Sequence, residues 1–238
     1  MRVERFAENP VIVPHMDARM GDNINGPSLV RAPSWIERPL GRYYLYFGHH
    51  RGAYIRLAYA DHLEGPWRTH QPGVLDLADS FCVKHIASPD VHVDEARQQV
   101  RLYYHGPVDE GDRHGPHRRH SQATRVAISK DGLRFTALPD VLGAPYLRVF
   151  RWGGWHYALG MPGIFYRSRD GLTPFEEGPN PFPPNMRHAA VKLDGETLTV
   201  FYTNRGDCPE RILRSTIDLT SDWTAWRPSP PVPVLEPE

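Results

Sequence analysis

The chain has 238 residues, of which 40% are apolar, and it carries 28 basic and 28 acidic residues. This apolar content is enough to build a core, so a fully disordered chain is excluded. The formal charge of zero offers no general attraction to nucleic acid or to acidic membranes. No apolar run approaches the roughly 18 residues of a membrane span, and the first residues lack a secretory signal. We therefore expect a cytoplasmic protein, with its oligomeric state left open.

The composition favours short strands over long helices. The chain has 20 glycines, 24 prolines and 11% aromatic residues, a mixture of many turns and many strand-forming side chains. Its two cysteines, Cys82 and Cys208, form neither a disulfide scaffold nor, on their own, a zinc site.

Four segments of the chain share one order of signals. Each starts with a short apolar strand, continues through an aromatic-rich second strand and a third strand, and closes at Trp or Phe. In the first segment the second strand is Tyr43–Phe47 and the closing residue is Trp67. Turns such as Asp131-Gly132 separate the strands. The four units span residues 25–70, 86–138, 142–178 and 186–227.

A four-stranded unit repeated every 40–50 residues or so is typical of a β-propeller. We therefore expect an all-β chain that folds as a single propeller domain over residues 1–238. A β-sandwich also has many short strands, but it does not explain the recurring order. The termini, residues 1–24 and 228–238, each contain one strand-like segment and could build part of a fifth blade. The alternative is that the chain stops where a fifth repeat would begin.

This pattern resembles the five-bladed propeller glycosidases of the arabinanase, fructosidase and levansucrase type, which include glycoside hydrolase family 43. The resemblance rests on the Gly/Ser/Ala-Pro strand starts, the Tyr-Tyr-Leu-Tyr second strand, the Ala-x-Ser-x-Asp-Gly turn and the closing Trp or Phe. It covers most of the chain. It implies a five-bladed propeller whose site lies at one end of a central channel.

The resemblance also implies three inward acids that carry out the acid–base steps of glycosidic cleavage. They would stand immediately before the prolines of the first and second blades, and two places before the proline of the third. The corresponding positions hold Gly26, Ser88 and Gly143. Asp22, Asn25 and Asp90 are the neighbouring candidates to replace them. His188 matches a fourth-blade histidine that, in the family, helps to hold a water or a calcium ion.

Polar residues are concentrated in the loops that surround the mouth of a propeller channel. These residues are Asp22, Asn25, His49, His50, Arg51, His85, His105, Arg187, Asn204, Arg205 and Asp207, and Asp90 and His92 lie within a first strand. Three interpretations remain open. One is acid–base catalysis by histidine together with Asp90. Another is a transition-metal site built from some of His49, His50, His85, Asp90, His105 and His188. The last is a structural role, in which the polar residues only form the hydrogen bonds that these loops need.

The leading prediction is a carbohydrate-active, glycosidase-like hydrolase that acts on a glycoside or oligosaccharide at the channel mouth. The predicted catalytic residues are Asp90, His49, His50 and His105, with Asp22 as the second carboxylate. The predicted substrate-binding residues are Asn25, Arg51, His85, Arg187, Asn204 and Arg205. No cofactor is required, and the candidate ion is calcium or a transition metal at His188 in the central channel.

Two other functions stay open. The fold could have kept a sugar pocket and lost its acids, which would leave a non-catalytic binding protein. Alternatively, histidines and tyrosines could carry out a lyase, isomerase or cyclase reaction on the same scaffold. The arginines near the mouth, and the basic segment Gly106–Gln122, make an anionic sugar one candidate ligand. That segment is either a solvated loop or a lid over the site.

Overall fold

The computed structural model describes residues 3–109, 111 and 121–237, so much of the segment Gly106–Gln122 lies outside the described residues. Within the described part the structure is all-β, with only short 3-10 turns between antiparallel strands. No helix in that part is long and apolar enough to cross a membrane. The chain divides into two compact units. Unit 2 is Arg5–Asp140, and unit 1 is Val141–Glu238 with Met1–Glu4.

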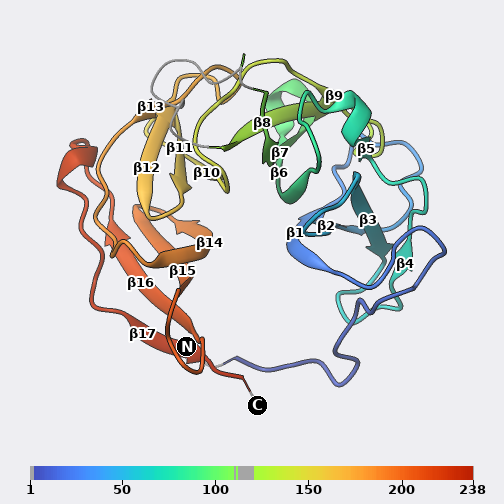
Figure 1. The fold of residues 1–238 in the computed structure, drawn as a ribbon, viewed down its shortest axis with the longest axis horizontal. Coiled ribbons are helices and arrows are strands. Elements are labelled where there is room, and N and C mark those ends of the chain that lie inside the picture. The colour runs from blue at the N-terminus through green and yellow to red at the C-terminus, as the bar shows by residue number, and fades with distance from the viewer. Residues whose placement is uncertain (1–2, 110, 112–120, 238) are drawn as a thin grey trace. The chain divides into compact units, whose positions relative to one another are not determined.

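Unit 2 contains two sheets that follow the chain strand by strand (Figure 1). The first sheet comprises β1 (Asn25–Arg31), β2 (Tyr43–Gly48), β3 (Tyr54–Ala60) and β4 (Arg68–Thr69), with β5 (Leu75–Asp76) also pairing with β3. The second comprises β6 (Ala87–Asp94), β7 (Gln99–Pro107), β8 (Gln122–Ser129) and β9 (Thr136–Ala137). Two 3-10 turns, η1 (Leu77–Asp79) and η2 (Glu95–Arg97), lie in the connections.

Unit 1 contains the other two sheets, which have the same antiparallel order. The third sheet comprises β10 (Arg148–Trp152), β11 (Trp155–Gly160), β12 (Ile164–Ser168) and β13 (Glu176–Glu177). The fourth comprises β14 (Met186–Asp194), β15 (Thr197–Asn204), β16 (Ile212–Asp218) and β17 (Val232–Leu235), with the turn η5 (Trp223–Ala225) before β17. The four units that the sequence predicts are therefore four sheets.

The terminal segments do not build a further sheet within the described residues. Val232–Leu235 is β17, which pairs with β16 and so completes the fourth sheet from its outer edge. The described residues before Asn25 form no strand. Instead, Val11, Ile12 and Met20 pack against the first sheet. The strand-like C-terminal segment thus belongs to the fourth blade, because its partner is the neighbouring strand of that blade.

The repeat is also visible in the backbone. Four residues have φ angles in the left-handed region, which residues other than glycine rarely adopt: Gly26 (60°), Ser88 (48°), Tyr146 (64°) and His188 (49°). Each lies at or just before the first strand of its sheet. In β1, β6 and β14 the pairing register shifts at this point, which marks a β-bulge. We call this end of a sheet, where the first strand begins and the second ends, its bulge end.

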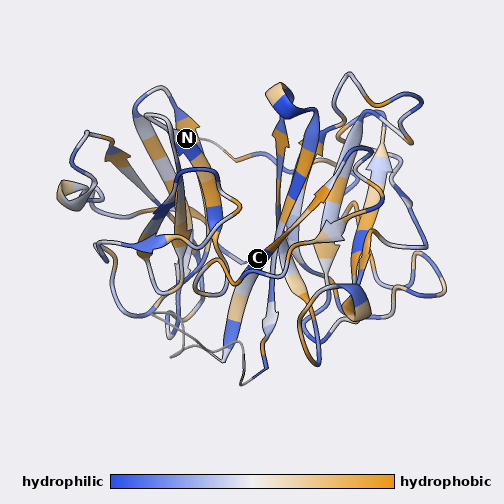
Figure 2. Cartoon of the chain, turned by 90° about the horizontal axis from the view of Figure 1, so that it is seen from above, coloured by the Kyte–Doolittle hydropathy of each residue, from blue (hydrophilic) through white to orange (hydrophobic). Residues whose placement is uncertain are grey.

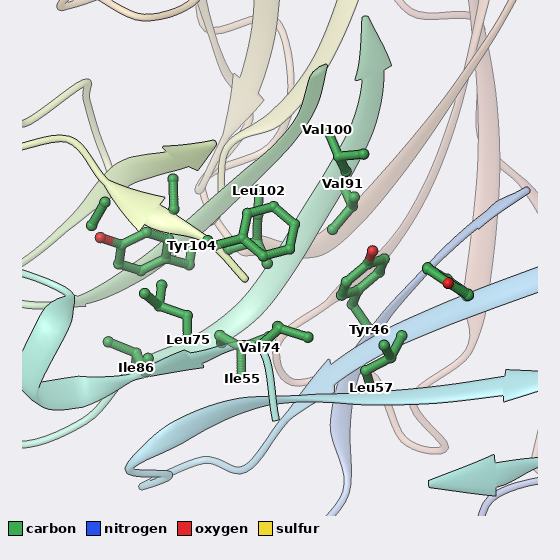
Figure 3. Close-up of a cluster of buried hydrophobic side chains, with 14 of the residues drawn as sticks. Tyr46, Ile55, Leu57, Val74, Leu75, Ile86, Val91, Val100, Leu102 and Tyr104 are labelled. Carbon is green, nitrogen blue, oxygen red and sulfur yellow. The ribbon is translucent and has the colours of Figure 1, made fainter. Parts of the chain in front are cut away.

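The core of unit 2 is formed by apolar side chains from both of its sheets. Figure 3 shows Ile55, Leu57 and Val74 facing Val91 and Leu102 across the space between the sheets. Ile55 and Leu57 flank Arg56 in β3, and Val91 lies between two polar residues in β6, so hydrophobic and hydrophilic positions follow one another in strands of Figure 2. Burial of this alternating face fixes the register of each strand.

The core of unit 1 is aromatic. The Trp226 ring lies 4.8 Å from that of Tyr157 and 5.2 Å from that of Phe165, measured between centroids. Gly178 is required beside Trp223, because a Cβ at position 178 would stand 2.4 Å from the indole ring. Trp223 and Trp226 therefore pack between the third and fourth sheets.

The Ser-x-Asp-Gly turns after the third strands are built in the same way in both units. In unit 1, Asp170 Oδ1 accepts hydrogen bonds from Leu172 N at 2.8 Å and from Thr173 N at 3.0 Å. Burial alone would raise the pKa of Asp170, but these bonds and one from Ser168 outweigh it and lower the pKa to about 2. In unit 2, Asp131 accepts the corresponding bonds from Leu133 N and Arg134 N.

We predict that Asp170→Asn destabilises the protein at neutral pH by about 1–3 kcal/mol, because the turn loses a charged acceptor. An Asp with a lowered pKa stabilises the fold above the unfolded pKa of about 3.9, and this stabilisation is lost as the pH falls through the folded value. The difference in the free energy of unfolding between variant and wild type should therefore shrink as the pH falls from about 4 to about 2. Urea unfolding at several pH values measures this.

Asp194→Asn is the matched control. Asp194 also lies in an Asp-Gly turn, but its carboxylate pairs with Lys192 at 2.6 Å, and both side chains are more than 60% exposed. An exposed pair of this kind contributes about 0–1 kcal/mol. If both variants lost the same free energy of unfolding, the hydrogen bonds of the Asp170 turn would contribute no more stability than an exposed charge.

Candidate functional site

The first strands of unit 2 contact each other at their two left-handed residues. A Cβ on Gly26 would lie 2.8 Å from Ser88 Cα and 2.9 Å from Ser88 Oγ. Position 26 is where the resemblance expects the first acid, and position 88 the second. Since Ser88 occupies the space beside Gly26, a carboxylate side chain has no room at position 26 in this backbone.

Hydrogen bonds secure this contact on both sides. Ser88 Oγ donates to Asn25 Oδ1 at 3.3 Å, and Val91 N donates to Ser28 Oγ at 2.9 Å. Asn25, predicted to bind substrate, is thus held at the bulge end of unit 2 by the second blade. Its half-buried side chain lies next to the position where the missing acid would stand.

His50 is held in one tautomer by a residue that the sequence did not single out. Asn23 Oδ1 accepts the main-chain N–H of His50 at 3.0 Å, which fixes that atom as the amide oxygen. The same oxygen lies 3.1 Å from His50 Nδ1. Because a carbonyl oxygen only accepts, Nδ1 must carry the proton. In neutral His50 the lone pair is therefore on Nε2, on an exposed residue.

His49 is held in the opposite tautomer. The main-chain N–H of Arg51 donates to His49 Nδ1 at 2.9 Å, so the ring proton is on Nε2. Burial lowers the pKa of His49, Arg56 lowers it further, and Asp22 opposes both. His49 is therefore a neutral hydrogen-bond donor at neutral pH. The adjacent histidines, predicted together as catalytic, have different chemical roles: one offers an N–H and the other a lone pair.

A buried arginine stabilises the segment that carries the two histidines. Arg56 is 5% exposed, and its Nη1 donates to Asn23 O at 2.6 Å and to Gly48 O at 3.4 Å. Its guanidinium also lies over the rings of Phe47 and Tyr54. These contacts join the end of β2 to the residue that orients His50. A charged residue among apolar neighbours in the third strand was the only sequence signal for this role.

His85 joins the same end of unit 2 from the connection before β6. Ile86 N donates to Gly52 O at 2.9 Å, which ties this connection to the turn that carries His49 and Arg51. Burial lowers the pKa of His85, a hydrogen bond with Gln122 opposes this, and the charge of Arg51 lowers the pKa again. The predicted residues His85 and Arg51 are therefore brought together, with Gln122 as an additional member.

Asp90, the predicted main carboxylate, pairs with a histidine on its own strand. His92 Nε2 lies 2.7 Å from Asp90 Oδ2, and the two side chains are 36% and 14% exposed. The pair arises because residues two apart in a strand share a face. His92 also makes an edge contact with the ring of Tyr103. Asp90 is therefore oriented by His92, and its catalytic role stays a prediction.

His105 and Asp22 lie in contrasting environments. The sequence places His105 in a loop after the second strand, but β7 extends past it, and His105 is 1% exposed between Ala87 and Thr124. It therefore does not lie on the open surface of the described bulge end. Asp22 is exposed, and its charge reaches His49.

The predicted residues of unit 1 lie at the bulge end of that unit. Arg187 Nε donates to His188 Nδ1 at 3.2 Å and lies 3.6 Å from Glu210 Oε1. The ring of Tyr146 lies 5.9 Å from that of His188, so the two left-handed residues of unit 1 also meet. Arg205 N donates to Asn185 O at 2.8 Å, next to Asn204 at the end of β15.

These surroundings do not fit the calcium ion that the resemblance implies at His188. Calcium takes six to eight oxygen ligands, mostly carboxylates and carbonyls. The guanidinium of Arg187 instead lies against the imidazole and would repel a cation. Among the described residues, no three His, Cys, Asp or Glu side chains are grouped as metal ligands. We therefore assign no step to a metal.

We predict that the neutral forms of His49 and His50 carry their protons on different nitrogens. Long-range ¹⁵N–¹H NMR spectra of histidine-labelled protein should show a protonated Nε2 for His49 and a protonated Nδ1 for His50. Asn23→Ala, which removes the acceptor, should release His50 from this tautomer and leave His49 unchanged. A wild-type His50 protonated at Nε2 would contradict the arrangement.

Comparison with solved structures shows the fold. The chain superposes on a family 43 β-xylosidase/α-arabinofuranosidase from a compost metagenome, in complex with xylotriose, with a TM-score of 0.67 and 16% identity over 97% of this chain and 82% of that one. The chain also superposes on a family 43 enzyme from Xanthomonas citri, complexed with xylotriose. Here the TM-score is 0.64 and the identity is 14%, over 88% of this chain and 74% of that one. The fold is thus an all-β propeller with four clear blades, similar to glycoside hydrolases.

Sequence comparison identifies a nearer relative. No family model matches the chain. The protein R118 of Acanthamoeba polyphaga mimivirus, described as uncharacterized, is 34% identical over 260 residues, which span 94% of this chain and 71% of the viral protein. Because the identity is this high over most of both proteins, the chain belongs to the family of mimivirus protein R118.

Proposed function

We propose that the chain is a carbohydrate-active, glycosidase-like enzyme that takes a small sugar or an oligosaccharide at the bulge end of unit 2. The observation that carries this proposal is the pair of neighbouring histidines held in opposite tautomers. One histidine offers an N–H and the next in sequence offers a lone pair, and a sugar hydroxyl both accepts and donates hydrogen bonds. Solved structures with this fold hold xylose or xylotriose, which supports a sugar as the ligand.

In this proposal each residue has a defined role. His50 Nε2 accepts a proton from water or from a sugar hydroxyl, and Asn23 holds the ring in the required tautomer. His49 donates from Nε2 to a sugar oxygen, and Arg51 and Asn25 orient the sugar. Glycosidic hydrolysis also needs an acid for the leaving oxygen, and Asp90 and Asp22 are the carboxylates that we assign to this task.

A second candidate function is sugar binding without cleavage. The observation that favours it is the contact between Gly26 and Ser88, which fills the space where the resemblance expects an acid. A binding protein would use the same donors and acceptors and would need no proton transfer. Product analysis separates the two functions, since hydrolysis adds water to the sugar and binding leaves it unchanged.

We predict that His50→Gln abolishes turnover while it keeps sugar affinity, because glutamine forms hydrogen bonds but does not take up the proton. The expected loss in kcat/KM is about 100-fold or more. The measurement combines calorimetric binding with mass spectrometry of the products, over a panel of neutral and acidic oligosaccharides. His62→Gln is the control, because His62 is an exposed histidine of unit 2 outside this group.

The possible outcomes separate the two candidate functions. Cleavage by wild type and by His62→Gln, but not by His50→Gln, supports the enzyme. Binding without any product supports the second candidate function. Cleavage by His50→Gln at the wild-type rate would remove His50 from the mechanism.

A further inference from the structure

Phe81 combines two features that rarely occur together. Its side chain is 54% exposed, the highest exposure among the large hydrophobic residues of the described chain. Its φ angle is 56°, in the left-handed region that is unfavourable for a bulky side chain. A single exposed phenylalanine needs no explanation by itself. One that is held exposed by a strained backbone points to a use for the ring, since such strain gathers at ligand sites.

The loop around Phe81 is firmly anchored. Tyr104 Oη donates to Ser80 O at 2.6 Å, and Cys82 N donates to Ser80 Oγ at 3.2 Å. Val83 N donates to Pro107 O at 2.8 Å. Ser80 is fully buried. The residues on either side of Phe81 are therefore fixed to β7, and the ring stands at a defined place.

The ring also has a fixed neighbour. The guanidinium of Arg125 lies 5.9 Å from the ring centroid. Arg125 is 1% exposed and donates from Nη1 to Pro139 O, so it is held by the second sheet. A cation near an aromatic ring is attracted by its π electrons, which helps to hold the ring. The exposed 54% of the Phe81 side chain is open to a ligand.

The position of this loop links Phe81 to the histidine group. Phe81 and His85 belong to the same connection between η1 and β6, and Ile86 of that connection bonds to Gly52 in the turn after His49–Arg51. The connection that carries Phe81 is thus joined by a hydrogen bond to the turn that carries the histidines. Asp79 and Lys84, which lie on either side of Phe81 in sequence, are also exposed.

We propose that Phe81 is an aromatic platform for a sugar ring of an oligosaccharide, a subsite distal to the histidine group. The C–H face of the sugar packs on the exposed phenyl ring, and its hydroxyls point to Asp79, Lys84 and solvent. The proposal rests on the proposed function, because it extends the same sugar site by at least one ring. It assigns Phe81 to binding and to no chemical step.

The test compares trisaccharides and monosaccharides of xylose, arabinose and galactose, with affinities measured by calorimetry. Phe81→Ala should weaken the affinity for the trisaccharide that wild type binds by about tenfold or more and leave the monosaccharide affinity unchanged. Phe81→Trp should restore or exceed wild-type affinity. Leu63→Ala is the matched control, because Leu63 is an exposed apolar residue of unit 2 on another loop, and it should behave as wild type.

Phe81→Gly separates ligand binding from stability. Glycine relaxes the left-handed backbone, so this variant should match or exceed the Tm of wild type while it loses trisaccharide affinity. A drop in Tm for Phe81→Gly would indicate that the ring packs for stability and would overturn the platform. Trisaccharide binding by Phe81→Ala equal to that of wild type would also overturn the platform and leave the proposed function standing. Failure of wild type to bind any sugar of the panel would overturn both.

Discussion

The contact between the first strands of unit 2, at Gly26 and Ser88, is the constraint on which the candidate site depends. Both residues have left-handed backbones, and Ser88 fills the space that any side chain at position 26 would need. This brings the two bulge ends together and places Asn25 against Ser88. It also closes the place of the first expected acid. A function on this propeller must therefore use other groups.

The other groups of unit 2 are organised by buried polar contacts. Arg56 ties Asn23 to the end of β2, and Asn23 then sets the tautomer of His50. The turn after β2 sets the opposite tautomer in His49 through the backbone of Arg51. The chemical difference between two adjacent histidines thus comes from their hydrogen bonds and not from their identity. This is the feature that connects the fold to the proposed proton transfer.

The sequence predicts the repeated sheets well, because aromatic-rich strands and Asp-Gly turns are local signals. The pairing of Val232–Leu235 with β16 is long-range, so the sequence alone leaves that segment open between two blades. The sequence places His105 in the loop after the second strand, whereas β7 continues to Pro107. Asn23 and Arg56 look ordinary in sequence, since their roles depend on contacts with distant residues.

The most direct test of the central claim is a crystal structure of the protein with a sugar that it binds in solution. We expect a sugar oxygen within hydrogen-bond distance of both His49 Nε2 and His50 Nε2, on the exposed bulge end of unit 2. Such a complex would place the proton acceptor against its substrate. A sugar bound at another place, with both histidines at a distance, would remove the histidines from the site and leave only the propeller fold in common with the glycosidases.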